Sequence, residues 1–167
     1  PATLADLRHE IARIERGTTA DAPGAVLPFG IADIDGRLPG GGLARGGLHE
    51  WFGDDRDRVG GPPTALAAWL AARRQARDRR AVLWIAPRRL DRESLYGPGL
   101  AASGLDPWSG DLLIVRARRP EDALWATEEA LRDRAVGTVC AELERIDLTA
   151  SRRLQLAAED AGTTGLI

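Results

Sequence analysis

The chain has 167 residues, of which 44% are hydrophobic and 29% charged, and its formal net charge is −2. This length fits one domain with a single buried core, no apolar run approaches the 18 residues of a transmembrane helix, and a single cysteine excludes a disulfide framework or a cysteine-rich zinc site. All 23 basic residues are arginine, which excludes mechanisms that need a lysine of this chain, and the near-neutral charge provides no overall field to attract DNA.

The chain opens with a predicted amphipathic helix over residues 3–16. Its apolar face consists of residues at helical spacing, namely Leu4, Leu7, Ile11 and Ile14. Residues 17–26 are small and polar, contain Pro and Gly, and predict a linker. We therefore divide the chain into an N-terminal helix with its linker, residues 1–26, and a core, residues 27–167. The apolar face must be buried, either on its own core or on another protein molecule.

Helical and strand patterns alternate through the core. The expected helices span residues 31–38, 64–79, 92–103, 120–134 and 149–161. The expected strands span residues 47–52, 81–86, 112–115, 136–143 and 164–167. This alternation predicts an α/β fold with a mostly parallel central sheet flanked by helices. Because the chain stops within a strand pattern, we expect the core to be truncated at its C-terminus.

A Gly-rich loop lies between the strand at 47–52 and the helix at 64–79, which is the context of a phosphate-binding P-loop. A working P-loop has the pattern G-x-x-x-x-G-K-[ST], in which amides cradle phosphate, Lys contacts it and a hydroxyl holds magnesium. In this sequence, the two glycines and the hydroxyl residue of that pattern have counterparts, in the same order, in Gly53, Gly61 and Thr64. The two residues before Thr64, Pro62 and Pro63, have no amide hydrogen to donate. The favoured interpretation is a loop of P-loop ancestry that no longer holds nucleotide.

Four segments of the core resemble the ImuA family of RecA-like proteins, which are accessory factors of bacterial mutagenic translesion DNA synthesis. They are LPFGI at 27–31, LPGGGLARGGLHE at 38–50, LYGPGLAASGLDP at 95–107 and LTASRRLQLAAEDAGTTGLI at 148–167. The resemblance implies a RecA-like P-loop NTPase core with an N-terminal helical arm.

The same resemblance implies that the chain is no ATPase. The P-loop lysine position falls on Pro62 or Pro63, and the position of the water-activating glutamate falls near Arg88. The Walker B carboxylate position falls on Glu142. A phosphoryl-transfer site acts by positioning and charge stabilisation, so these losses remove most of its function. What remains is a vestigial nucleotide site of Gly53, Gly61, Thr64 and Glu142, with no metal and no cofactor.

By resemblance, the chain is a cytoplasmic, non-catalytic adaptor in SOS-induced translesion synthesis. The implied partners are an ImuB-like inactive Y-family polymerase, an error-prone DNA polymerase III alpha-type subunit and RecA. DNA contact is indirect or weak, no membrane is involved, and the N-terminal arm offers a route to a homo-oligomer. The alternative is a degenerate nucleotide-binding module that binds ATP or single-stranded DNA, with Arg56, Arg58 and Thr64 on phosphate and Glu142 on magnesium.

Candidate interaction residues lie at four places: the N-terminal helix, the end of the strand at 81–86, a loop tryptophan and the start of the helix at 149–161. They are Leu4, Leu7, Ile11, Ile14, Arg88, Arg89, Arg92, Trp108, Arg152 and Arg153. The arginine pair at 152–153 either contacts phosphate or a protein carboxylate, or is simply solvated. Apolar patterns around Trp69, Trp84, Trp125 and Cys140 predict that these four side chains are buried.

Overall fold

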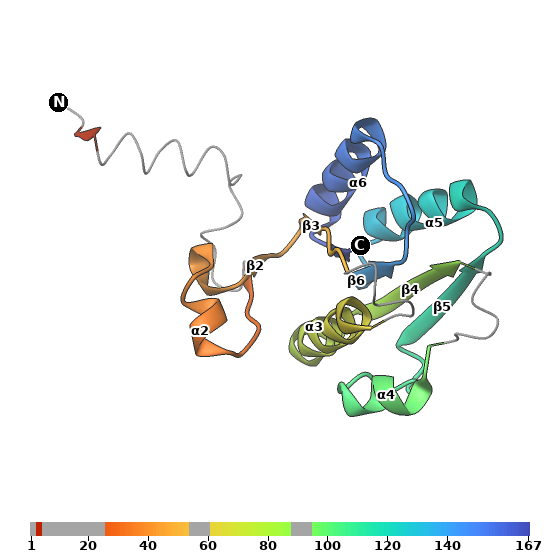
Figure 1. Ribbon diagram of the computed structural model, residues 1–167, viewed down its shortest axis with the longest axis horizontal. Coiled ribbons are helices and arrows are strands. Elements are labelled where there is room, and N and C mark those ends of the chain that lie inside the picture. The colour runs from red at the N-terminus through yellow and green to blue at the C-terminus, as the bar shows by residue number, and fades with distance from the viewer. Residues whose placement is uncertain (1–2, 5–25, 54–60, 88–94) are drawn as a thin grey trace. The chain divides into compact units, whose positions relative to one another are not determined.

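The structure, a computed structural model, describes residues 3–4, 26–53, 61–87 and 95–167 of the chain (Figure 1). Most of the predicted N-terminal helix therefore lies outside the described residues, and Leu4, which is described, is exposed. The chain falls into two compact units, Pro1–Arg45 and Gly46–Ile167.

The first unit is a short hairpin with one helical turn. Strand β1 (Val26–Leu27) pairs antiparallel with β2 (Leu43–Ala44), and α2 (Ala32–Asp35) and a 3-10 turn (Pro39–Gly41) lie between them in sequence. The helix predicted over 31–38 is shorter than expected. The Asp35 carboxylate accepts hydrogen bonds from the amides of Phe29 at 2.7 Å and Gly30 at 2.8 Å, so it closes the turn that begins the helix.

The second unit contains a five-stranded sheet in which all neighbouring strands are parallel (Figure 1). Its order is β3-β7-β6-β4-β5. The bounds are Leu48–His49 for β3, Ala81–Pro87 for β4, Leu112–Ala117 for β5, Val136–Ala141 for β6 and Thr164–Leu166 for β7. All six residues of the central strand β6 are buried, as expected for a parallel sheet covered on both faces.

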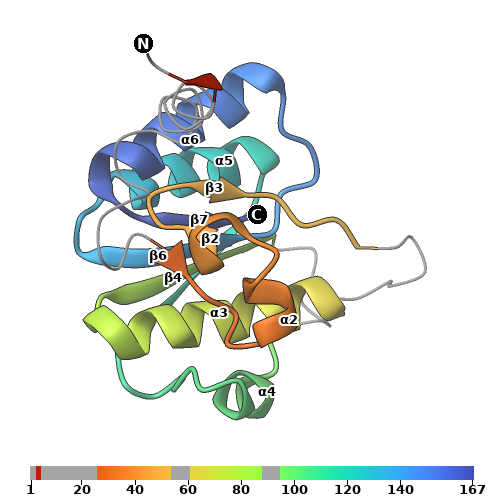
Figure 2. The same ribbon diagram turned by 90° about the vertical axis from the view of Figure 1, so that its left-hand side faces the viewer.

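Four helices cover the sheet: α3 (Pro62–Asp78), α4 (Gly97–Ala102), α5 (Pro120–Arg132) and α6 (Leu148–Ala161). Figure 2 shows α3 and α4 on one face and α5 and α6 on the other. The predicted α/β fold with a parallel sheet and flanking helices is therefore confirmed. The strand predicted over 47–52 is shorter in the ladder, although the amide of Trp51 still donates to the carbonyl of Ile167 at 2.7 Å.

Helix ends follow their sequence signals. Gly104 ends the α4 segment at φ 93°, and the next amide, that of Leu105, donates to the carbonyl of Leu100 at 3.1 Å. Gly162 ends α6 at φ 67° in the left-handed region, where glycine is favoured. At the other end of α6, the Asp147 carboxylate accepts from the amide of Ala150 at 2.7 Å, which satisfies one unpaired donor of the first turn.

The core between the sheet and α5 and α6 is aliphatic and closely packed. Its fully buried members include Ile85, Leu131, Val139 and Leu154. Trp84 and Cys140 are also buried, as predicted, and Trp69 is half-buried. The prediction for Trp125 is wrong, because its side chain is 65% exposed. The inner face of α5 is formed by Ala123, Thr127 and Leu131, and position 125 lies on the opposite side of the helix.

Candidate functional site

Helix α3 begins at Pro62, directly after Gly61, so two prolines occupy its first turn. Neither has an amide hydrogen, and the amide of Ala65 already donates to the Gly61 carbonyl at 3.2 Å. Helix N-termini bind phosphate through free amide hydrogens aided by the helix dipole. In the described first turn only the amide of Thr64 remains as such a donor, so this helix start is a poor anion site.

A pocket of about 140 Å³ lies where α3 begins and the strands β6 and β7 end. It brings together Thr64 and Glu142, two residues of the predicted vestigial site. The rest of its lining is mainly apolar and consists of Trp51, Pro63, Ala67, Trp84, Cys140, Ala141, Leu143, Leu166 and Ile167. Gly53 and Gly61 are described but do not line this pocket, and Arg56 and Arg58 lie outside the described residues.

The Glu142 carboxylate has an internal partner. The indole Nε1 of Trp84 donates to its Oε1 at 3.1 Å, and Trp84 is buried. Trp84 lies on β4, level with Cys140 of the neighbouring strand β6, and Glu142 directly follows β6. In addition, the Glu142 amide donates to the Ile85 carbonyl at 3.0 Å. The Glu142 side chain is therefore held toward β4 by the indole of Trp84.

Cys140 lies two residues before Glu142 on β6 and faces the same pocket. Burial, together with the negative charge of Glu142, raises the pKa of its thiol far above the ordinary value. The thiol is therefore protonated and is a poor nucleophile, because the thiolate is the reactive form. It contributes to packing, as predicted for a buried cysteine.

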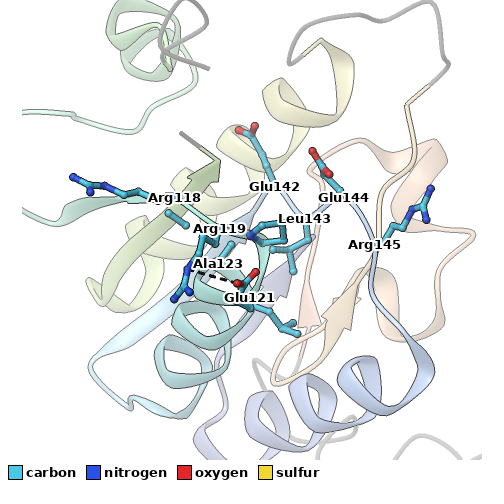
Figure 3. Close-up of a pocket in the computed structure, with 11 residues that line it drawn as sticks. Arg118, Arg119, Glu121, Ala123, Glu142, Leu143, Glu144 and Arg145 are labelled. Atoms are coloured by element: carbon cyan, nitrogen blue, oxygen red, sulfur yellow. Dashed lines mark ion pairs between the residues drawn. The ribbon is translucent and has the colours of Figure 1, made fainter. Parts of the chain in front are cut away.

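A larger pocket of about 470 Å³ lies beside the ends of β5 and β6 and the start of α5 (Figure 3). Its charged lining is mixed in sign and comprises Arg118, Arg119, Glu121, Glu142, Glu144 and Arg145. The Arg119 guanidinium contacts the Asp122 carboxylate at 2.7 Å and the Glu121 carboxylate at 3.5 Å. The hydrogen bond from Arg119 lowers the pKa of Asp122, and the bond to Asp122 raises the pKa of Arg119. Because the charges around this pocket are of both signs and partly paired, the pocket favours no strongly charged small ligand.

The candidate interaction residues are spread over the molecule. Trp108 is 76% exposed, and its amide donates to the Asp106 carboxylate at 2.9 Å, so a closed turn presents this side chain. Arg152 is exposed, whereas Arg153 forms an ion pair with the Glu128 carboxylate of α5. The remaining candidates, Leu7, Ile11, Ile14, Arg88, Arg89 and Arg92, lie outside the described residues.

Sequence reasoning missed two buried charged groups. Glu128 is 3% exposed and contacts Arg132 at 2.5 Å as well as Arg153. Arg74 is 1% exposed and pairs with Asp78 at 2.8 Å. The i,i+4 spacings of Glu128 with Arg132 and of Arg74 with Asp78 were visible in the sequence, but nothing in it indicated that Glu128 and Arg74 are buried.

The described residues contain no group of three or more His, Cys, Asp or Glu side chains placed to hold a metal ion. Across the same residues, no helix combines the length and the apolar character needed to cross a membrane.

No family model matches the chain. It is 42% identical over 155 residues to "Protein ImuA" from Caulobacter vibrioides strain NA1000 / CB15N, and equally to that of strain ATCC 19089 / CIP 103742 / CB 15. The match covers 92% of this chain and 60% of each relative, so the chain spans less than two thirds of their length.

Among solved structures, the crystal structure of SulA from Pseudomonas aeruginosa is similar, with a TM-score of 0.52 and 26% sequence identity. The match covers 71% of this chain and 92% of SulA. It supports the α/β core described above. The sequence identity to the two Caulobacter proteins leads to one conclusion: over 92% of its length this chain is a relative of ImuA, as the four sequence segments predicted.

Proposed function

We propose that the chain is the RecA-like part of a non-catalytic adaptor in SOS-induced mutagenic translesion DNA synthesis. The similarity to ImuA supports a place in DNA damage-linked mutagenesis. The observation that supports the non-catalytic role is the start of α3, where Pro62 and Pro63 offer neither a lysine nor amide hydrogens to a phosphate.

Two further features support a site that has lost its chemistry. The chain contains no lysine to contact a terminal phosphate, and the Glu142 carboxylate is bonded to the Trp84 indole. Phosphoryl transfer depends on positioned cations and donors around the transferred group. With these replaced by proline rings and indoles, the pocket at the start of α3 stabilises the fold rather than a reaction.

In this proposal, the chain binds an ImuB-like inactive Y-family polymerase, RecA or both, alongside an error-prone DNA polymerase III alpha-type subunit. Trp108 is the best described anchor, since exposed tryptophans often carry much of the binding energy at interfaces. Arg152 and the N-terminal arm are further contact candidates, and the arm also offers a route to self-association. Binding to DNA is indirect or weak, in line with the net charge of −2.

The test is binding of the purified chain to an ImuB-like protein and to RecA, measured by pull-down and biolayer interferometry. The variant Trp108→Ala is compared with Trp125→Ala, because both remove an exposed indole from different places on the same unit. We expect binding by the wild type, at least about tenfold weaker binding by Trp108→Ala and little change with Trp125→Ala. Failure to bind either protein contradicts the adaptor role.

Hydrolysis and DNA assays address the alternative of a live nucleotide or single-strand module. We expect ATP hydrolysis at background level with and without single-stranded DNA. Phosphate-driven DNA binding would weaken steeply between low and moderate salt, and a tight complex with that salt dependence would favour the alternative.

A further inference from the structure

Strand β5 forms one edge of the sheet (Figure 1), and two of its large apolar side chains are exposed. Leu113 is 50% exposed and Ile114 is 44% exposed. Adjacent strand residues point to opposite faces, so both faces of the sheet end in an aliphatic residue at this margin. Among the described residues β5 pairs only with β4, which leaves its outer backbone groups without a strand partner.

The common devices that protect sheet edges are missing from β5. Proteins usually blunt an edge with proline, a bulge, several charges or a very short strand. The segment LLIVRA contains no proline and one charge, Arg116. Its pairing with β4 runs without interruption from Val82↔Leu112 to Pro87↔Ala117. The opposite edge differs, because β3 has only two residues in the ladder.

Charge along this edge runs from acidic to basic. Asp111 precedes the strand, Arg116 lies near its end, and Arg118 follows it; all three are exposed. A second copy of the strand laid alongside in the parallel direction would place like charges together. Laid antiparallel, the acidic end of each copy lies beside the basic end of the other, with the aliphatic residues in the middle.

We propose that two copies of this chain associate by antiparallel pairing of their β5 edges, so that the two sheets become continuous. In such a dimer, a two-fold axis perpendicular to the sheet relates the β5 strand of one copy to the β5 strand of the other. The residue on the axis therefore lies opposite its own copy, either Leu113 opposite Leu113 or Ile114 opposite Ile114. The pairing satisfies the outer backbone groups of β5 and covers both exposed aliphatic side chains. It uses residues other than those of the N-terminal arm and does not depend on the proposed function.

The first test is the oligomeric state of the purified chain by sedimentation equilibrium across a concentration series. We expect a dimer, and at least about tenfold weaker association in Leu113→Lys and Ile114→Lys, since each buries a charge at the paired edge. The matched control is Leu156→Lys on the outer face of α6, where the side chain is similarly exposed. A monomeric wild type, or a dimer that these edge variants leave intact, overturns the proposal.

The second test does not rely on destabilising variants. Because the native cysteine, Cys140, is buried, a cysteine placed at the edge is the main reactive thiol. Under mild oxidation we expect a disulfide-linked dimer from either Leu113→Cys or Ile114→Cys, according to which residue lies on the axis. Leu156→Cys is expected to remain monomeric on a non-reducing gel. If neither edge variant forms more linked dimer than Leu156→Cys, the antiparallel pairing is wrong.

Discussion

The two ends of the strands use polar residues in different ways. At the amino end, Arg74 is buried, pairs with Asp78 and donates to the carbonyls of Gly137 at 3.5 Å and Gly162 at 3.3 Å. At the carboxyl end, where ligands bind in open α/β sheets, a single carboxylate is held by an indole, and prolines begin the facing helix.

The buried charge of Arg74 therefore lies at the end of the strands opposite to the one where ligands bind in open α/β sheets. The most deeply buried cation among the described residues supports the end of α6, where the helix dipole favours positive charge. Arg80 reinforces it by donating to the Gly162 carbonyl at 3.3 Å. The small pocket at the carboxyl end beside the start of α3, by contrast, is lined mainly by aromatic and aliphatic side chains. Its position matches a ligand site, but its side chains are those of a core.

The largest expected effect is at the amino end. Replacing Arg74 by Ala leaves Asp78 without this partner, removes the donor to the Gly137 carbonyl and removes one of the two side-chain donors to the Gly162 carbonyl. Breaking a buried ion pair on one side costs about 3 kcal/mol or more. Urea unfolding is expected to show this loss, whereas Arg77→Ala, an exposed arginine one turn along α3, changes the free energy of unfolding by less than about 0.5 kcal/mol. Equal effects of the two variants would contradict a structural role for Arg74.

A second pair of variants compares buried and exposed carboxylates on α5. Glu128→Ala removes the shared partner of Arg132 and Arg153 and is expected to destabilise the chain by about 2 kcal/mol. Glu129→Ala removes an exposed contact to Arg132 at 3.1 Å and is expected to cost under about 0.5 kcal/mol. The difference in urea midpoint between the two variants measures the value of the link between α5 and α6.

At the carboxyl end, the buried thiol predicts a dependence of stability on pH. The pKa of Cys140 is raised in the folded state, so the unfolded chain releases this proton first. Stability is therefore complete below the ordinary thiol pKa and falls as the pH rises above it. One pH unit above that value the loss is about 1.4 kcal/mol. Urea unfolding as a function of pH should show it in the wild type and not in Cys140→Ala; parallel curves would contradict the burial.

The smallest expected effect concerns the cap of α6. Asp147→Ala removes the acceptor for the Ala150 amide and is expected to cost about 1 kcal/mol. Asp160→Ala, an exposed residue in the last turn of α6, is the control and should be neutral or slightly stabilising, because a negative charge there opposes the helix dipole. A larger loss with Asp160→Ala would contradict the cap assignment.

The sequence predicted much of the fold because its signals are local. Proline at position 120 and glycines at 104 and 162 sit where helices begin or end, and apolar runs mark the central strands. The fate of Trp125 was not predictable from its apolar neighbours, since one position along a helix decides between core and solvent. The short α2 likewise depends on the hydrogen bonds of Asp35 to the preceding loop.

Of the four residues predicted for the candidate site, Thr64 and Glu142 line one pocket and Gly53 and Gly61 do not. Thr64 and Glu142 come together because the ends of parallel strands meet at one edge of the sheet. The bond between Trp84 and Glu142 joins residues 58 apart in sequence, and that between Arg153 and Glu128 joins residues 25 apart. Such partners depend on strand register and helix packing, which a single sequence does not specify.

Thermal unfolding with and without millimolar Mg-ATP tests most directly that the pocket at the start of α3 no longer binds nucleotide. The account predicts the same melting temperature in both conditions, with AMP as a further comparison. A ligand at a hundred times its dissociation constant stabilises a protein by about 2.7 kcal/mol, which shifts the melting temperature of a domain this size by several degrees. A shift of that size with Mg-ATP would contradict the account and make the proline-bearing helix start a working nucleotide site.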